Sequence, residues 1–218
     1  MHATTHPTAA LSRRALALYS AALLALLALS GWRPFERATW AMEVAPVVLV
    51  LPVLWATQRR FALTPLLYAL IFAHACVLML GGHYSYARVP LGEWLREVFA
   101  FERNHYDRIG HFMQGFVPAI AARELLLRHT GLSRADSRGG WLFAVVTAVA
   151  LAVSALYELL EWGAAVALGA GADEFLATQG DVWDTQKDMA MAWIGAMLAQ
   201  ALLARWHDRQ LAALNTPR

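Results

Sequence analysis

Six stretches of mostly apolar residues follow one another along the chain, separated by more polar segments. A helix that spans a bilayer needs about 20 apolar residues, with a range of roughly 17 to 25. The second stretch contains Pro46 and Pro52, so we expect a kink or an incomplete crossing there. The expected helices cover approximately residues 14–31, 40–57, 61–82, 107–127, 140–168 and 187–204.

Residues 90–99, between the third and fourth stretches, show a different pattern. Apolar and charged side chains fall on opposite faces of a helix there, with Leu91, Trp94, Leu95 and Val98 against Glu93, Arg96 and Glu97. This spacing predicts an amphipathic helix that either lies in the membrane interface or serves as a simple connector.

The composition agrees with a membrane protein, since 59% of the 218 residues are hydrophobic and only 16% are charged. No Gly/Ser-rich or Pro-rich linker divides the chain, so we expect one integral membrane domain over residues 1–218. The fold class that follows is an all-α polytopic bundle of about six transmembrane helices with one interfacial helix. The apolar run after Arg14 is long for a secretory signal, and further hydrophobic segments follow it, so we expect a retained first helix.

The net charge and the cysteine content add little to this assignment of the fold class. The net charge of +2 gives no indication of a nucleic-acid partner, and we expect membrane lipids as the main surroundings. Cys76 is the single cysteine, so an internal disulfide is excluded.

Basic residues indicate the orientation, because Lys and Arg are enriched on the cytoplasmic side. With an inside amino terminus, eleven of the eighteen Lys and Arg residues are cytoplasmic, and both termini are expected there. The acids divide more sharply, since thirteen of the sixteen Asp and Glu residues then lie on the outer side. Acids contribute little to topology, so this asymmetry favours a site at the outer face.

Three polar clusters lie beside or inside the apolar stretches, at residues 106–111, 157–162 and 180–188. A charged side chain at the centre of a membrane helix costs roughly 2.5 to 3.5 kcal/mol on insertion scales, so these residues need partners. The expected topology brings all three clusters to one membrane level. Helical spacing gives each cluster a stripe, namely Asp107, His111 and Gln114; then Thr147, Ser154, Glu158 and Glu161; then Asp181, Asp184 and Asp188.

Carboxylates that lie close together must share protons, pair with cations or bind a metal. The acids outnumber the nearby cations Arg108, Lys187 and Arg103, which leaves room for a divalent cation. Carboxylates with one imidazole suit Mg²⁺, Mn²⁺ or Zn²⁺. The candidate ligands are Asp107, His111, Asp181, Asp184 and Asp188. The candidate catalytic residues, which would move a proton, are Glu158, Glu161 and His111.

A purely structural interpretation stays open for each of these residues. Glu158 and Glu161 would then pair with Arg108 and Lys187, and Asp181 would cap the last helix. Other polar residues have simpler explanations, again on sequence alone. His74 is expected to be neutral and hydrogen-bonded, and His83 and His105 are expected to be solvated or to join the site. Glu43 is expected to be a further carboxylate of the site. Arg123 and Arg128 are expected to reach the lipid headgroups.

Three strings of the sequence resemble a known family. They are YDRIGHFMQGFVP at residues 106–118, YELLEW at residues 157–162 and TQGDVWDTQKDM at residues 178–189. In these strings the chain resembles the YjdF-like family of bacterial inner-membrane proteins, which implies the inner membrane as its location but no activity. The layout of Asp107 and His111, a later acidic helix and Asp181 with Asp184 is also distantly similar to the VanZ-like membrane family, from which Glu158 and Glu161 depart.

Three functions remain open from the sequence. The first is metal-assisted or acid/base chemistry at the outer face on a lipid-linked or envelope substrate. The second is an ion-coupled or proton-coupled transporter, against which the absence of an inverted repeat counts. The third is a purely structural subunit.

Overall fold

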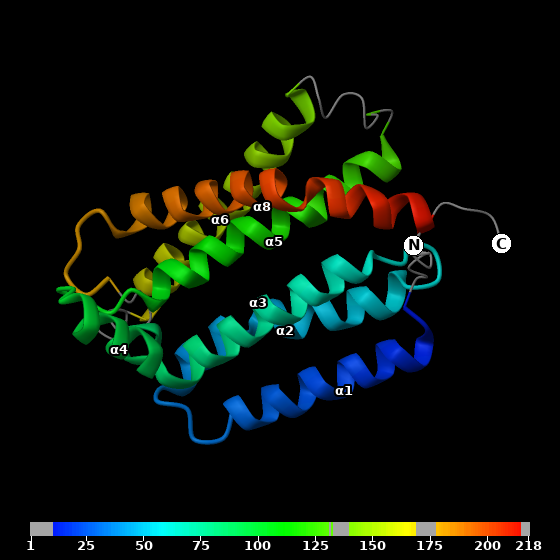
Figure 1. The fold of residues 1–218 in the computed structure, drawn as a ribbon. Coiled ribbons are helices and arrows are strands. Elements are labelled where there is room, and N and C mark those ends of the chain that lie inside the picture. Colours follow the sequence, from blue (N-terminus) through cyan, green and yellow to red (C-terminus); the bar gives the residue numbers. More distant parts are fainter. Residues whose placement is uncertain (1–10, 131, 133–139, 169–177, 215–218) are drawn as a thin grey trace.

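The computed structural model describes residues 11–130, 132, 140–168 and 178–214, and within these residues the fold is entirely helical. The helices lie close to the expected positions (Figure 1). In chain order they are α1 (Arg13–Ser30), α2 (Arg37–Thr57), α3 (Pro65–Tyr84), the 3₁₀ turn η1 (Tyr86–Arg88), α4 (Pro90–Phe99), α5 (Tyr106–His129), α6 (Trp141–Leu168) and α8 (Asp184–Leu214).

The long helices run side by side, and α5 lies at the centre of the bundle, where it packs on α3, α6 and α8 (Figure 1). The helices α1 and α2 pack on α3 on one side of it. One end of the bundle carries α4 together with the starts of α5 and α8, and we call this the site end. The other end, where α1 begins and α8 ends, we call the opposite end.

Five helices, α1, α2, α3, α6 and α8, are long and apolar enough to cross a membrane. The sixth long helix, α5, has 24 residues, which corresponds to about 36 Å at a rise of 1.5 Å per residue. It is less apolar than α1, α2, α3 and α6 and similar to α8, because it carries buried charges along its length. The expected polytopic helical membrane fold is therefore present, and its charged helix lies inside the bundle, shielded by the others.

Local sequence explains where the helices begin. The Ser12 hydroxyl accepts a hydrogen bond from the Ala15 N–H at the start of α1, and the Thr64 hydroxyl does the same for Leu67 before α3. The helix α2 continues without interruption through Pro46 and Pro52, and its 21 residues are long and apolar enough to cross a membrane. The amphipathic helix falls where its pattern predicts, at residues 90–99.

A close crossing of α5 and α8 holds the centre of the bundle together. At Gly115, an added methyl group would come within 1.8 Å of the Ala192 carbonyl oxygen. At Gly195, it would come within 2.2 Å of the Phe112 carbonyl oxygen. Only glycine allows the two backbones to approach in this way, as is common where membrane helices meet.

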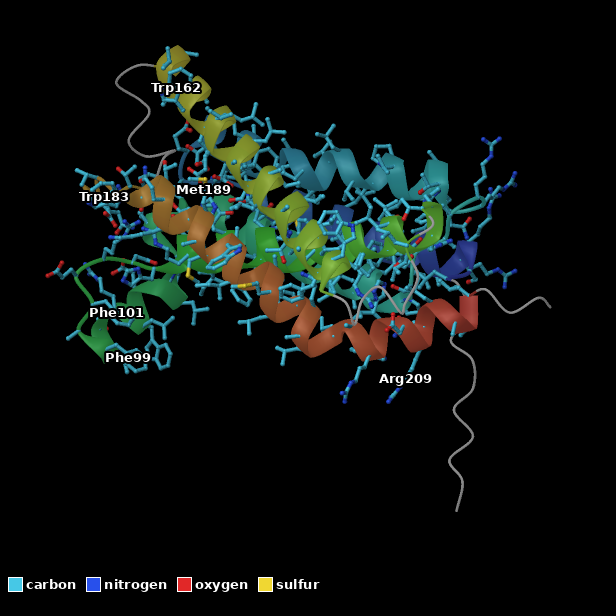
Figure 2. The ribbon with its side chains drawn as sticks, turned by 90° about the horizontal axis from the view of Figure 1, so that it is seen from above. Phe99, Phe101, Trp162, Trp183, Met189 and Arg209 are labelled. Atoms are coloured by element: carbon cyan, nitrogen blue, oxygen red, sulfur yellow. The ribbon has the colours of Figure 1, made fainter. Side chains whose placement is uncertain are left out.

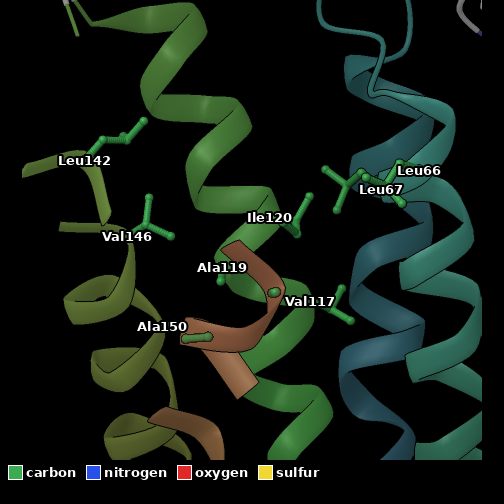
Figure 3. Close-up of a cluster of buried hydrophobic side chains, with 10 residues drawn as sticks. Leu66, Leu67, Val117, Ala119, Ile120, Leu142, Val146 and Ala150 are labelled. Carbon is green, nitrogen blue, oxygen red and sulfur yellow. The ribbon is translucent and has the colours of Figure 1, made fainter. Parts of the chain in front are cut away.

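An apolar layer fills the middle of the bundle between α3, α5, α6 and α8 (Figure 3). Its members are small or branched side chains that make dense contacts, and they include Leu67, Ile120, Leu142, Val146 and Ala150. This layer lies between the polar groups of the two ends, and it encloses one buried polar contact, in which the Gln200 amide donates to the Thr147 hydroxyl at 2.9 Å.

The opposite end contains a buried ionic network that corrects one expectation from the sequence. Arg123 is only 2% exposed and donates to Asp208 at 2.8 Å and to the His207 Nδ1 at 3.0 Å, instead of reaching toward lipid headgroups. Arg128 donates to Glu124 at 2.7 Å and lies over the Phe61 ring. A buried guanidinium needs acceptors inside the protein, and these carboxylates provide them.

Glu124 is the centre of this network and is fully buried. Its carboxylate accepts hydrogen bonds from the Thr64 hydroxyl at 2.8 Å and from the Thr64 N–H at 3.1 Å. The His207 Nε2 lies 3.0 Å from the same carboxylate. Because a guanidinium only donates, Arg123 requires the His207 Nδ1 to accept, which leaves the imidazole proton on Nε2 to be donated to Glu124. The network therefore fixes the histidine tautomer.

Candidate functional site

The three polar clusters meet at the site end, as the sequence predicts. The first two turns of α5 bring Asp107 and His111, the second half of α6 brings Glu158 and Glu161, and the first turns of α8 bring Asp188. Asp107, His111, Glu158 and Asp188 are each less than a tenth exposed. Residues from three helices, up to 81 positions apart, therefore form one polar site inside the bundle.

Asp107, His111 and Asp188 form a group that can hold a metal ion, with one ligand atom from each within 4.8 Å of the others. The His111 Nε2 lies 3.4 Å from an Asp107 oxygen and 3.7 Å from an Asp188 oxygen. These separations are too long for good hydrogen bonds, but they are suitable for groups that share a cation between them.

The other ring nitrogen of His111 has a defined role. Its Nδ1 lies 3.1 Å from the side-chain oxygen of Gln114. Because a carbonyl oxygen only accepts, Nδ1 carries a proton and donates it to Gln114, and the other ring nitrogen, Nε2, faces the two aspartates. Metal-binding histidines are usually oriented in this way by a hydrogen bond from the second nitrogen.

A second group that can hold a metal consists of His111, Glu158 and Glu161. The Glu158 Oε1 lies 3.6 Å from the His111 Nδ1, the nitrogen that already donates to Gln114. The donor geometry therefore favours the group with Asp107 and Asp188 as the metal-binding one. Glu158 is left as a carboxylate next to it.

Two buried carboxylate oxygens have no hydrogen-bond partner among the described residues, and both lie in this site. They are the Asp107 Oδ2, which is 3.8 Å from the Arg108 guanidinium, and the Glu158 Oε1. A buried unpaired polar atom costs about 1–3 kcal/mol, more when it is charged. Such atoms are explained when the site takes up a cation, a proton or a substrate.

Two arginines bind the aspartates of α8 from the side of α5. Arg108 makes close ion pairs with Asp184 and Asp188, and its guanidinium lies 3.4 Å from Asp181. Arg103 donates to Asp184 at 2.7 Å. These contacts tie the start of α8 to the start of α5, and they engage the same aspartates that the sequence offers as metal ligands.

Asp181 lies at the solvent side of this arrangement. Its carboxylate accepts hydrogen bonds from the Lys187 ammonium at 2.6 Å and from the Trp183 N–H at 3.0 Å. The Lys187 contact, with the Trp183 N–H, holds the pKa of Asp181 below its usual range. The Trp183 bond agrees with the capping role expected for Asp181.

A small inner pocket of about 20 Å³ adjoins the imidazole. A cavity needs about 10–15 Å³ to hold one water molecule, so this pocket admits a single water or an ion. Its polar lining combines carboxylates, the imidazole, an amide and two phenols, from Glu43, Tyr86, Asp107, His111, Gln114, Tyr157 and Glu161.

A larger outer cavity of about 510 Å³ opens between the end of α6 and the start of α8. Figure 2 shows α6 diverging from α8 toward Trp162, while Trp183 and Met189 lie on the α8 side. Its wall includes Glu158 and Asp184 as well as apolar side chains. The volume falls within the 300–1,000 Å³ that is typical of small-molecule sites.

The pairing expected from the structural interpretation is wrong in detail. Arg108 and Lys187 bind aspartates of residues 181–188, not Glu158 or Glu161. His74 is not hydrogen-bonded as expected, since its buried Nε2 has no partner among the described residues.

Three further expectations concern residues around the site. Glu43 joins the inner pocket, as expected for a further carboxylate. His83 instead bonds to the Ser30 carbonyl, and His105 lies just before α5, so neither belongs to the candidate metal groups. The assignment of Asp181 and Asp184 as metal ligands stays a prediction.

Sequence reasoning missed the two tyrosines of the site. The Tyr157 hydroxyl donates to Glu43 at 3.1 Å and bridges α6 to α2. Tyr86, in the 3₁₀ turn, lines the inner pocket and packs against the glycines at positions 81 and 110. Tyr157 precedes Glu158 directly, and this adjacency was the only available signal.

Fold and site together define a polytopic helical membrane protein of the inner membrane with buried acidic and histidine groups at one end of its bundle. The chain belongs to the family of predicted membrane proteins DUF2238, whose family model matches residues 15–209. It is similar to the inner membrane protein YjdF of Escherichia coli (strain K12), with 52% identity over 190 residues, which cover 87% of this chain and 88% of the relative. No solved structure matches the chain.

Proposed function

We propose that this protein carries out metal-assisted acid/base chemistry on a lipid-linked or envelope substrate at the outer face of the inner membrane. In this proposal both termini are cytoplasmic, so the site end faces the periplasm. The excess of basic residues on the side of the termini supports this orientation.

The observation that carries the proposal is the orientation of His111. Its Nδ1–H is engaged by Gln114, and its Nε2 faces the carboxylates of Asp107 and Asp188. Two carboxylates and an imidazole match the preferences of Mg²⁺, Mn²⁺ or Zn²⁺, and they leave coordination positions for water and substrate. The metal would act as a Lewis acid and lower the pKa of bound water.

Glu158 is placed to move the proton. Its Oε1 has no hydrogen-bond partner among the described residues and lies 3.6 Å from the His111 Nδ1, and Glu158 also lines the outer cavity. A carboxylate at this boundary can accept a proton from a nucleophilic water and return it to a leaving group. Glu161, which lines the inner pocket, would serve as a second acid or base.

The outer cavity would give water and a polar reactant access to Glu158. Ion pairs would hold the wall of this cavity in place. They join Asp181 and Asp184 to Arg103 and Arg108. In the proposal these aspartates position the site, and Asp188 contributes the ligand from α8.

Metal analysis of the purified protein tests the proposal directly. Wild type should retain close to one divalent ion per chain by mass spectrometry of the elements, and His111→Ala and Asp107→Asn should retain far less. Glu97→Gln is the matched control, because it removes an exposed carboxylate of α4 outside the candidate ligands. Absence of metal from the wild type would reject the metal, and equal metal content in all four proteins would reject His111 and Asp107 as its ligands.

A second test separates chemistry from structure. Glu158→Gln keeps the shape of the side chain but removes its basicity, so the protein should remain folded with its metal while losing function in cells. Loss of the folded protein would instead favour a structural subunit. A transport function is disfavoured because Val117, Ala119 and Ile120 interrupt the polar groups of α5 between Gln114 and Arg123.

A further inference from the structure

An apolar groove of about 600 Å³ lies beside the site, among α2, α3, α5 and α6. Nearly all of its lining is aliphatic, with side chains such as Val50, Ile71, Val117, Leu125 and Val153. Its only polar lining residues are His74, Gln114 and Tyr157. In a membrane-spanning bundle, a groove of this kind opens toward lipid chains rather than water.

The walls of the groove are α2 and α6, which make little direct contact with each other. At the site end, the hydrogen bond from Tyr157 to Glu43 joins the two walls. Gln114 and Tyr157 line both this groove and the inner pocket, so the apolar space ends directly against the polar site.

Two features at this junction lack partners. The buried Nε2 of His74 has none among the described residues, and His74 lines the groove. Pro118 also lines the groove and has no N–H, so the carbonyl of Gln114, four residues earlier, receives no helical hydrogen bond from it. Both groups are available to a polar atom that enters from the groove.

We propose that the groove binds the hydrocarbon chain of a long-chain alcohol, with its terminal hydroxyl at His74, Gln114 and Tyr157. The inference rests on the proposed function in that the hydroxyl end lies against the same site, and it adds the substrate class. The chain would be the lipid part of the molecule on which the site acts.

The size of the groove favours a chain over a protein partner. A helix about 10 Å wide occupies roughly 400 Å³ per 5.4 Å turn, so a spanning helix needs several times the space available. A partner's helix would also meet the Tyr157–Glu43 bridge at the closed end, where there is no room to continue. A single flexible chain with one polar end has neither difficulty.

The size of the junction selects the polar end. The adjoining pocket of about 20 Å³ is too small for a phosphate group. A hydroxyl is small and neutral, and it both donates and accepts, so it can bond to His74 whichever nitrogen carries the proton.

Photo-crosslinking tests the proposal with the full chain in lipid nanodiscs. The probe is a long-chain alcohol with a diazirine in its alkyl chain, and the comparison probe is the phosphate monoester of the same alcohol. We expect the alcohol to label peptides of α2, α5 and α6, and to do so at least tenfold more than the phosphate. Equal labelling by both probes, or labelling spread over all helices, would overturn the proposal.

Two variants locate the binding site. Val153→Trp places a large ring in the groove and should abolish the specific labelling. Leu202→Trp, at an exposed position on α8 that is 69% accessible, is the matched control and should label like wild type. His74→Phe keeps the ring volume and removes the polar end, so it should reduce the preference for the alcohol to less than threefold. Labelling of Val153→Trp at the wild-type level would reject the groove as the site.

The same samples separate this inference from the proposed function. Metal content measured alongside should be unchanged in Val153→Trp, since the groove lies outside the ligand group. If wild type labels specifically but contains no metal, the metal proposal fails and the groove stands. If wild type contains metal but labels without specificity, the groove proposal fails alone.

Discussion

His111 and Gln114 lie one turn apart on α5, with the imidazole Nδ1 3.1 Å from the side-chain oxygen of the glutamine. This bond turns the other ring nitrogen, Nε2, toward Asp107 and Asp188. The pair therefore sets the direction in which the imidazole faces the two aspartates, although Gln114 itself does not touch the proposed metal.

Gln114→Leu should weaken metal binding without unfolding the protein. Removal of a hydrogen-bond partner behind a metal ligand typically costs 10–100-fold in affinity, and we expect a loss in this range. Titration of the metal-free protein with Mn²⁺ or Zn²⁺ measures it. Gln186→Leu, on the exposed face of α8, is the control and should bind as wild type does. Unchanged affinity in Gln114→Leu would show that the histidine is not a ligand through Nε2.

The sequence was sufficient to predict the helices and the meeting of the polar clusters. Long apolar runs permit little besides spanning helices, and residues such as Asp107 and Glu158 cannot face lipid, so they must turn toward each other. The expected boundaries of the fifth helix in the bundle, 140–168, agree with α6 at Trp141–Leu168. The position of such long apolar runs is determined by the surrounding lipid alone, so it can be predicted without knowledge of the contacts between helices.

The partners within the clusters could not be predicted in the same way. Arg108 pairs with the aspartates of α8 instead of Glu158 because of the rotation and rise of three helices, which spacing along one helix does not determine. Arg123 near a helix end is compatible with both snorkelling and burial. Its partners His207 and Asp208 are more than 80 residues away and carry no local signal.

Arg108→Met should destabilise the folded protein strongly. The substitution leaves the buried Asp188 without its guanidinium and Asp184 with Arg103 alone, and breaking a buried ion pair in this way costs about 3–5 kcal/mol. Unfolding in mixed detergent, followed by circular dichroism, measures the change. Lys187→Met is the control, since its side chain is 55% exposed and such pairs contribute about 1 kcal/mol or less. A small effect of Arg108→Met would mean that another cation neutralises these aspartates.

Glu124→Gln should destabilise the opposite end and leave the site end intact. The variant loses the charge that holds Arg128 and His207 while the surrounding donors remain buried. We expect a loss of about 3–5 kcal/mol in the free energy of unfolding, with metal content per folded chain unchanged. The control is Arg209→Gln, which changes an exposed charge on the turn of α8 that carries His207. A parallel loss of metal would indicate that the two ends are coupled through the apolar layer.

Glu36 gives a prediction on pH. Hydrogen bonds from the Thr39 and Ala38 N–H groups at the start of α2 hold the pKa of Glu36 below its usual range. A lowered folded pKa contributes stability above the unfolded value of about 4.3, and this contribution disappears as the pH falls through the folded pKa. The stability difference between wild type and Glu36→Gln should therefore be constant at neutral pH and shrink below about pH 4.3. Thermal unfolding across this range measures the difference, with Glu97→Gln as a control for the loss of one negative charge.

Glycine substitutions test whether the α5–α8 crossing positions the site. Gly115→Ala would bring a methyl group within 1.8 Å of the Ala192 carbonyl oxygen, a backbone atom that cannot rotate away. The helices must separate, and overpacking of this kind costs about 1–3 kcal/mol. Because Asp107 and His111 lie on α5 and Asp188 on α8, the separation should also weaken metal binding.

Gly163→Ala is the matched control, because an added methyl group there has no neighbour within 4 Å. Alanine is favoured over glycine in a helix by about 1 kcal/mol, so this variant should be as stable as wild type or slightly more so. Unfolding and metal titration of both variants decide the matter. If Gly115→Ala loses stability but binds metal with wild-type affinity, the crossing holds the fold and the ligand group does not depend on it; if both decline together, the spacing of the two helices sets the geometry of the site.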